Sequence, residues 1–295
     1  QAEDGIRDLV RSRGLGDVYK RQEMQKISLN IRKKGTHKIS VIPTMGALHE
    51  GHLSLIKKAQ EKKIITIVTI FVNPIQFDDK KDLTNYPSKL KNDIYKLKSI
   101  GVNYLFTPNI KDIYPEGYKT KVVVEDLKNH LCGLKRPGHF DGVTSVVLKI
   151  FNITLPHKAF FGEKDLQQLI IIKQMVNDLN LPIKVISHPI VREKSGLAMS
   201  SRNLRLTTNG KKIAPFIYTG LVEAKKEFKK NNKITVKKII NNLKKYYAIN
   251  NIKHIDYIEV INPRDMSYPL IPRSGDYILT AIKIGKIRLI DNLKF

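Results

Sequence analysis

The stretch Ile39-Ser-Val-Ile-Pro-Thr-Met-Gly-Ala-Leu-His-Glu-Gly-His-Leu-Ser-Leu-Ile56 organises the rest of the chain. Its first residues form a short apolar run rich in β-branched side chains, which predicts a buried strand that ends at Ile42, before Pro43. A loop follows, and from Leu53 onward apolar residues recur at helical spacing. The stretch therefore predicts a strand, a loop and a helix in immediate succession.

The start of this expected helix carries groups that suit a phosphate. The backbone N–H groups around Gly51 and His52 are donors at a helix N-terminus, which attracts anions. Gly46 and Gly51 have no Cβ atom, so the backbone can approach a ligand closely. His49 and His52 can donate hydrogen bonds to phosphate oxygens from the same turn. For a His-x-x-His pair taken alone, a polar loop without a ligand is the alternative.

The composition fits a soluble globular protein with a core of its own. The chain has 295 residues, and its most apolar run, Ile64–Val72, is too short to span a bilayer. The single cysteine, Cys132, excludes a disulfide framework and a thiolate metal cluster. We therefore expect a soluble, cytoplasmic protein with no membrane partner, built as two domains or one large one.

The formal charge of +26 raises the question of nucleic-acid binding. Lysine far outnumbers arginine and is scattered over every segment, which we interpret as the bias of an AT-rich genome. The densest basic region, Lys225–Lys245, alternates with apolar residues as a solvated helix does. We predict no nucleic-acid partner, and a basic RNA-binding module is the alternative from a different functional class.

Four further short apolar segments are expected strands, and helical patterns separate them. The expected strands are Ile64–Val72, Tyr104–Phe106, Ala159–Phe161 and Ile183–Ile186, with helices over Leu90–Ile100 and Leu166–Leu179. This alternation predicts an α/β fold, a Rossmann-like doubly wound parallel sheet. Ligands of such sheets bind at the carboxyl ends of the strands, where this chain has its unusual polar residues.

The pattern changes near residue 191, after which a Lys-rich helical segment precedes more strands. The strands expected there are Ile255–Ile261, Tyr277–Ile284 and Ile287–Ile290. The last two form a predicted hairpin across Gly285-Lys286. We predict a Rossmann-like domain over 23–190 and a smaller α+β lid domain over 191–295. Residues 1–22 are charged, interrupted by glycines and similar to translated vector sequence, so we expect a dispensable, non-native leader outside the fold.

The string Pro43-Thr-Met-Gly-Ala-Leu-His-Glu-Gly-His52 resembles the signature of the pantothenate synthetase (pantoate-β-alanine ligase) family. Its His-x-Gly-His core also resembles the ATP motif of the wider adenylylating nucleotidyltransferases and class I aminoacyl-tRNA synthetases. The further family-like strings are Arg136–Val143, Gly162–Asp165, Ser195–Asn203 and, more weakly, Arg288–Asn292. The resemblance thus covers most of the chain and keeps the family's order.

The resemblance implies an ATP site on these strings. The implied ATP contacts are Met45, Gly46, His49, Gly51, His52, Gly162, Glu163, Lys164, Asp165, Val191, Met199, Ser200, Ser201 and Arg202. The candidate catalytic residues among them are His52, His49, Lys164 and Arg202. Lys164 is expected to clamp a phosphate, and His52 to act as a proton donor or transition-state stabiliser. Val191 matches a position at adenine, and the segment from Met199 to Arg202 corresponds to a loop that closes over the triphosphate.

The resemblance also implies a pocket for pantoate and β-alanine. Gln76 and Gln168 match pantoate-binding glutamines, and their amides can both donate to and accept from a polyol carboxylate. Arg136 and His139 are expected to face the same pocket. Asp93 matches a position associated with Mg²⁺, which proteins hold with few carboxylates because phosphate oxygens and water complete its shell.

The reaction implied has two steps and no covalent nucleophile. The pantoate carboxylate attacks the α-phosphate of ATP to give pantoyl adenylate and pyrophosphate, and the amine of β-alanine then releases AMP and pantothenate. Such chemistry needs positioning and charge neutralisation. The resemblance further implies a homodimer. The alternative enzyme is another adenylyl- or cytidylyltransferase, which would leave Gln76 and Gln168 without a role. Ser195 stands where the family usually has Asp, and we expect this difference to affect loop positioning but not the phosphate contacts.

Overall fold

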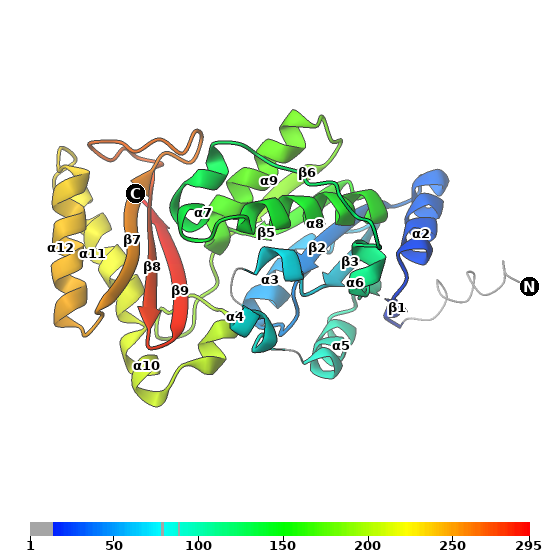
Figure 1. Ribbon diagram of the computed structural model, residues 1–295, viewed down its shortest axis with the longest axis horizontal. Helices are drawn as coiled ribbons and strands as arrows, with labels where there is room; N and C mark the ends of the chain where they lie inside the picture. The colour runs from blue at the N-terminus through cyan, green and yellow to red at the C-terminus, as the bar shows by residue number, and fades with distance from the viewer. Residues whose placement is uncertain (1–13, 78–79, 88) are drawn as a thin grey trace, which may run out of the picture. The chain divides into compact units, whose positions relative to one another are not determined.

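The computed structural model describes residues 14–77, 80–87 and 89–295, and the chain forms two compact units (Figure 1). Unit 1 takes the described residues of 1–124, 138–161 and 172–188, and unit 2 takes 125–137, 162–171 and 189–295. The chain therefore enters unit 2 three times. The predicted domains, by contrast, divide the chain with a single cut after residue 190.

Unit 1 is built on a six-stranded sheet in the order β1-β4-β3-β2-β5-β6. Its strands are β1 (Gly16–Val18), β2 (Lys38–Thr44), β3 (Ile64–Ile70), β4 (Tyr104–Phe106), β5 (Lys158–Gly162) and β6 (Lys184–His188). β2 pairs in parallel with β3 and β5, and β4 pairs in parallel with β3 and β1. The predicted parallel α/β sheet is confirmed.

Helices alternate with these strands. They are α2 (Arg21–Lys34), α3 (Glu50–Ala59), α4 (Lys80–Thr84), α5 (Leu90–Ser99), α6 (Ile110–Ile113), α8 (His139–Thr154) and α9 (Leu166–Asp178). α3 buries Leu53, Leu55 and Ile56 in a core shared with Ile42 and Val68 of the central strands. Each such side chain contributes about 1.5–3 kcal/mol when fully buried, so the apolar face of α3 fixes this helix at the end of β2.

β2 continues through Pro43, two residues further than the sequence predicted. The carbonyl of Ile39 accepts the N–H of His157 at 2.8 Å, and the N–H of Ile39 donates to His157 Nδ1 at 3.0 Å. Pro43 lies four residues on and faces the same side, beyond the paired residues Ser40-Val41. A proline is tolerated here because no ladder bond needs the N–H that it lacks.

The structure also differs from the expected leader over residues 1–22. Residues 1–13 lie outside the described residues, but β1 pairs with β4 and α2 begins at Arg21. Met24 is fully buried in α2. A Cβ atom on Gly16 would lie 2.7 Å from the Tyr104 ring, so this glycine allows a close approach of β1 to β4. The glycines that suggested a leader outside the fold therefore include one that the sheet requires.

Unit 2 has a three-stranded antiparallel sheet in the order β7-β8-β9. Its elements include α7 (Leu131–Lys135), α10 (Thr208–Ile213), α11 (Phe216–Lys230), α12 (Val236–Ile249), β7 (His254–Ile261), β8 (Tyr277–Ile284) and β9 (Ile287–Lys294). Leu221 of α11 and Leu243 of α12 share a core with Ile282 of β8. Ile284 pairs with Ile287, and Gly285 has the positive φ (+59°) that a two-residue turn needs, which confirms the predicted hairpin.

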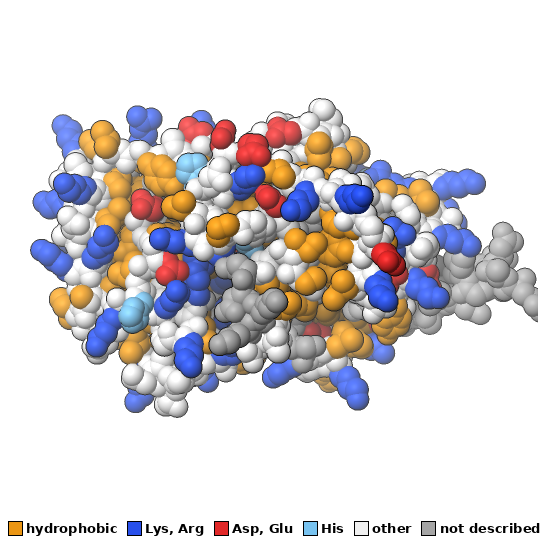
Figure 2. Space-filling view, viewed as in Figure 1, with side chains coloured by type: hydrophobic (Ala, Val, Ile, Leu, Met, Phe, Trp, Pro, Cys, Tyr) orange, Lys and Arg blue, Asp and Glu red, His pale blue; other side chains and the backbone are white. Residues whose placement is uncertain are grey.

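Basic side chains are spread over the visible face of the molecule, and the described helices do not suit a membrane span. Figure 2 shows lysine and arginine side chains dispersed over the visible face, among hydrophobic and acidic ones. Within the described residues, none of the helices combines the length and the apolar character that crossing a membrane requires.

His157 should make the stability of unit 1 depend on pH. Burial lowers the pKa of His157 below its ordinary value of 6.5, and the charges of Arg32 and Lys38 lower it further. The unfolded chain therefore binds this proton more tightly than the folded one, so the contribution is complete above about pH 6.5 and is lost as pH falls below it. We expect His157→Gln to reduce the loss of unfolding free energy between about pH 7 and pH 5. Urea denaturation at several pH values measures this change.

The control is His37→Gln, which changes an exposed histidine of the same unit. A reduced pH dependence in both variants would mean that the effect is not specific to His157. Equal slopes for the parent and His157→Gln would show that His157 titrates alike in the folded and unfolded states.

Candidate functional site

The predicted site residues divide between the two units. Unit 1 carries Met45, Gly46, His49, Gly51, His52, Gln76, Asp93 and His139. Unit 2 carries Arg136, Gly162, Glu163, Lys164, Asp165, Gln168, Val191, Met199, Ser200, Ser201 and Arg202.

The two histidines stand together at the start of α3, as the sequence predicted. His49 is the residue before the helix, and its ring centroid lies 4.1 Å from that of His52. The backbone N–H of His49 donates to Nδ1 of His52 at 3.3 Å. Because Nδ1 accepts this bond, the proton of a neutral His52 belongs on Nε2. His52 is thus held as an Nε2–H donor.

The loop between β2 and α3 is fixed by Asp93, which is 1% exposed in α5. One carboxylate oxygen accepts the N–H of Ala47 and the other accepts the N–H of Leu48, each at 2.8 Å. Lys96, on the same helix, donates to the carbonyl of Leu48 at 2.5 Å. Gly46 has a φ of +84°, and a Cβ there would lie 3.3 Å from the Asp93 carboxylate. The absent side chain of Gly46 leaves room for that carboxylate.

This arrangement does not fit the predicted role of Asp93 as a magnesium ligand. Each of its oxygens accepts a backbone N–H group, and the residue is 1% exposed, which leaves almost none of the carboxylate open to an ion from solvent. The described residues contain no group of three or more His, Cys, Asp or Glu that could hold a metal ion. Asp93 therefore positions the loop between β2 and α3 in this structure.

Gln76 lies in the short 3₁₀ helix η1 (Pro74–Gln76), after β3, and is 8% exposed. Its Nε2 lies 2.8 Å from the sulfur of Met45, and its Oε1 accepts a hydrogen bond from Asn73 at 3.2 Å. Nδ1 of His139 donates to the backbone carbonyl of Gln76 at 2.7 Å. A Cβ on Gly142 would lie 2.9 Å from the backbone of Gln76. The structure thus brings together Met45, Gln76 and His139.

Asn73 binds the proposed site residue Gln76, and sequence reasoning gave it no role. It is 1% exposed, and its Nδ2 donates to the carbonyl of Gly142 at 3.0 Å as well as to Gln76. Its Oδ1 accepts from the hydroxyl of Tyr114 at 2.9 Å. Burial raises the pKa of Tyr114, which keeps this hydroxyl a donor. The signal in the sequence is an Asn directly before Pro74, a pattern typical of a helix start.

In unit 2, η3 (Glu163–Asp165) carries the predicted phosphate clamp. The Lys164 side chain is 20% exposed, and its Nζ lies 3.8 Å from the Asp165 carboxylate. The carbonyls of Glu163 and Lys164 both accept hydrogen bonds from the side chain of Asn292, at 2.9 and 3.1 Å. The backbone of this turn is therefore tied to β9.

Two adjacent glutamines at the start of α9 have different surroundings. Gln167 is 4% exposed, and its side chain bonds the carbonyls of Leu127 and His130 and the N–H of Cys132. These bonds hold α7, directly before Arg136. Gln168 is half-buried, and its side chain makes no hydrogen bond to the described residues. Of the two, Gln168 is the one with unused donors and acceptors.

The segment 191–202 is held as a narrow two-stranded turn. The N–H of Met199 donates to the carbonyl of Val191 at 2.9 Å, and Arg192 bridges to Ala198. Arg192 makes two hydrogen bonds to the carboxylate of Asp291, at 2.6 and 2.9 Å. The guanidinium lies 3.7 Å from the ring centroid of Tyr218. Sequence reasoning missed Arg192 because its partner lies in β9, far along the chain.

The end of this segment leads into the 3₁₀ helix η4 (Ser201–Arg205). The Ser200 hydroxyl accepts the N–H of Arg202 at 3.3 Å, so it caps the turn that carries the predicted phosphate contacts. The Ser195 hydroxyl accepts the N–H of Leu197 at 3.4 Å. An aspartate can make the same bond from this position, so serine preserves the local turn.

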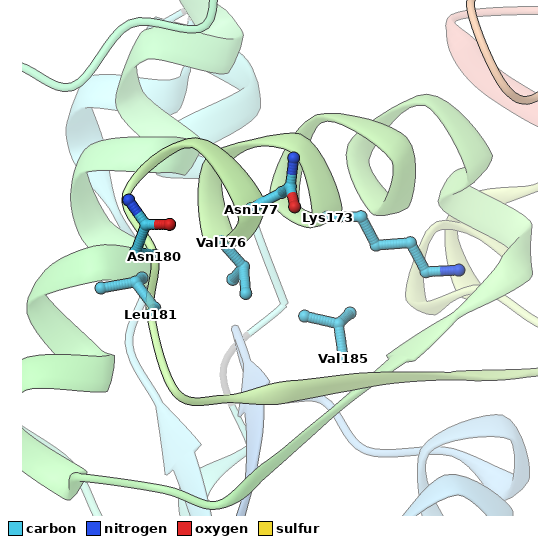
Figure 3. Close-up of a pocket in the computed structure, with 6 residues that line it drawn as sticks. All are labelled: Lys173, Val176, Asn177, Asn180, Leu181 and Val185. Atoms are coloured by element: carbon cyan, nitrogen blue, oxygen red, sulfur yellow. The ribbon is translucent and has the colours of Figure 1, made fainter.

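The pocket drawn in Figure 3 is lined by other residues, all of them in unit 1. It has a volume of about 430 Å³, and its lining comes from the end of α9, the turn that follows and β6. The lining residues are Lys173, Val176, Asn177, Asn180, Leu181 and Val185. None of the predicted site residues is among them.

We expect Asp93→Asn to lower the free energy of unfolding by about 2 kcal/mol, since the new amide points an N–H at a backbone N–H. Asp112→Asn is the matched control, because this half-buried residue also accepts a backbone N–H, from Asn109 at 3.2 Å, in a bond exposed to solvent. The control should change stability by less than about 0.5 kcal/mol. Urea denaturation compares the two variants, and equal losses would mean that the bonds of Asp93 do not fix the loop.

Known proteins are similar to this chain over nearly its whole length. A family model described as pantoate-beta-alanine ligase matches residues 18–294. A pantothenate synthetase of Caldicellulosiruptor bescii is 44% identical over 94% of this chain and 97% of that protein. Another, from Thermodesulfovibrio yellowstonii, is 47% identical over 92% of this chain and 96% of that protein.

Solved structures agree with these relatives. A crystal structure of a pantothenate synthetase from Thermus thermophilus has a TM-score of 0.89 and 34% identity, over 95% of this chain and 99% of that one. A pantoate-beta-alanine ligase from Francisella tularensis, complexed with beta-gamma ATP and beta-alanine, has a TM-score of 0.78 and 37% identity, over 95% and 97%. The chain belongs to the pantoate-beta-alanine ligase family.

Proposed function

We propose that this chain condenses pantoate with β-alanine in an ATP-dependent reaction that yields pantothenate. The reaction proceeds through enzyme-bound pantoyl adenylate and releases pyrophosphate first and AMP second. The observation that carries the proposal is the arrangement of His49 and His52 at the start of α3, in a chain of this family. A family relative solved with beta-gamma ATP and beta-alanine supports the choice of substrates.

His52 acts in this proposal as a neutral hydrogen-bond donor to a phosphate oxygen. Its Nδ1 accepts the N–H of His49, so Nε2 carries the proton. The N–H of a neutral imidazole is a weak acid, and the geometry therefore favours stabilisation of the departing pyrophosphate over proton transfer to it. A fixed donor of this kind is effective because it needs no reorganisation during the reaction.

The remaining nucleotide contacts follow the sequence-based assignment. Lys164 and Arg202 neutralise the charge of the phosphates in this proposal, and the hydroxyls of Ser200 and Ser201 are further phosphate contacts. The other proposed nucleotide contacts are Met45, Gly46, Gly51, Gly162, Glu163, Asp165, Val191 and Met199. Each charged donor neutralises charge that develops on the leaving group, which lowers the barrier to adenylation.

Gln76 and Gln168 are the proposed pantoate ligands, with Arg136 and His139 as further contacts of pantoate or β-alanine. The half-buried Gln168 amide has unused hydrogen-bonding capacity among the described residues, which suits a polyol carboxylate. The homodimer and the cytoplasmic location stay predictions, and light scattering of the purified chain tests the first. Magnesium, which the family resemblance implies, is proposed to accompany ATP without a ligand from Asp93.

The order of the half-reactions tests the proposed function. Pantoate should promote exchange of labelled pyrophosphate into ATP in the absence of β-alanine, because the adenylate forms reversibly. AMP should accumulate only after β-alanine is added. Exchange that required β-alanine would overturn the adenylate mechanism, and ATP turnover independent of pantoate would point to a different nucleotidyltransferase.

His52→Ala should lower the rate of this exchange by roughly 10²-fold or more, the scale of losing one preorganised donor. His37→Ala, a change of an exposed histidine in the same unit, should leave the rate within about twofold of the parent. The melting temperature of both variants shows whether the fold is retained. If the His52 variant exchanged at the parental rate, its proposed role would have to be given up.

Ser195→Asp should change the KM for ATP by a few-fold at most, a shift of roughly 1 kcal/mol or less. The reason is that either side chain can accept the N–H of Leu197 and keep the turn. Steady-state kinetics with ATP as the varied substrate measures the effect. A change of two orders of magnitude would place Ser195 in the nucleotide site itself.

A further inference from the structure

Two adjacent residues near the end of β9, Asp291 and Asn292, link the two segments of unit 2 that carry proposed nucleotide contacts. They pair with Thr280 and Leu279 of β8. Their exposed fractions are only 2% and 3%. Buried side chains this polar need hydrogen-bonding partners, and here the partners lie on the two segments.

The carboxamide of Asn292 fixes the backbone of η3. Its Nδ2 donates to the carbonyl of Glu163 at 2.9 Å and to that of Lys164 at 3.1 Å. One amide group bonded to two consecutive carbonyls determines the orientation of the turn from which the Lys164 side chain extends. Without these bonds the turn can change its conformation. The Lys164 side chain then no longer extends from a fixed backbone position.

The carboxylate of Asp291 fixes the segment 191–202 through Arg192. The two hydrogen bonds of 2.6 and 2.9 Å set the plane of the guanidinium. The same guanidinium donates to the carbonyl of Gly196 at 3.1 Å and to that of Asn292 at 3.3 Å, and it stacks on Tyr218. Breaking a buried pair with this many bonds is strongly unfavourable, so the segment is held in one arrangement.

We propose that Asp291 and Asn292 are positioning residues for the nucleotide in the proposed reaction. They keep Lys164 and the segment 191–202 in one arrangement within unit 2, and they act through backbone carbonyls and through Arg192 rather than by touching a substrate. The inference rests on the proposed function. Within the described residues, neither side chain bonds to Gln168 or to its helix, so the effect should fall on ATP and not on pantoate or β-alanine.

The test compares Asn292→Ala with a matched control, Asn242→Ala. Nδ2 of Asn242 also donates two hydrogen bonds, to the carboxylate of Glu227 at 3.2 and 3.1 Å, but it links α12 to α11. Asn292→Ala should raise the KM for ATP about tenfold and leave the KM values for pantoate and β-alanine within about twofold. Asn242→Ala should leave all three within about twofold. Calorimetric titration with ATP alone should show the same tenfold weakening for Asn292→Ala only.

The outcomes separate this inference from the proposed function. If the parent bound ATP but made no pantothenate, the proposed function would fail, while the calorimetric comparison would still decide the positioning role. Equal ATP affinities in the two variants, or an equal rise in KM for all three substrates, would overturn the inference. If Asn292→Ala did not fold, Arg192→Lys would replace it, because lysine keeps the charge but not the paired bonds to Asp291. The same ATP-specific loss is expected.

Discussion

One buried carboxylate holds the loop on which the candidate site of unit 1 depends. Gly46 and Ala47 have positive φ angles, so the chain leaves β2 abruptly and the following N–H groups turn toward the interior. Buried N–H groups need acceptors, and Asp93 supplies one to Ala47 and one to Leu48. The start of α3, with His49 and His52, follows directly from this loop. The direction of the imidazole of His52 is therefore a consequence of a residue in α5.

In unit 2 a side chain also fixes a loop backbone, but here the side chain donates the hydrogen bonds and the backbone accepts them. The turn of η3 presents carbonyls instead of N–H groups, and the amide of Asn292 donates to both. Loops after strands lack the ladder bonds that satisfy the backbone within a sheet, so side chains must satisfy it there. In both units the side chain that does so comes from a distant part of the sequence. Long-range polar contacts thus determine the shape of the loops that carry the proposed site.

This explains which features could be predicted from the sequence. Periodicity of apolar residues predicts β2, α3 and the hairpin at Gly285, because each depends on neighbours along the chain. The continuation of β2 through Pro43 depends on where the pairing with β5 ends, and the need for a glycine at position 16 depends on the ring of Tyr104. Neither is visible in a local pattern. The family resemblance predicts that Asp93 binds a metal ion, whereas in the structure its carboxylate oxygens accept backbone N–H groups.

The net positive charge of the chain and the fixed donors of the proposed site have different effects on a phosphate. A formal charge of +26 attracts any polyanion and can speed its approach, but dispersed lysines on flexible stems do not orient a phosphate. Orientation requires donors whose positions are fixed before the ligand arrives. His52 is fixed by the backbone N–H of His49, and the turn that carries Lys164 is fixed by Asn292. Selectivity for ATP should therefore depend on the few hydrogen bonds that fix these donors and much less on the number of lysines.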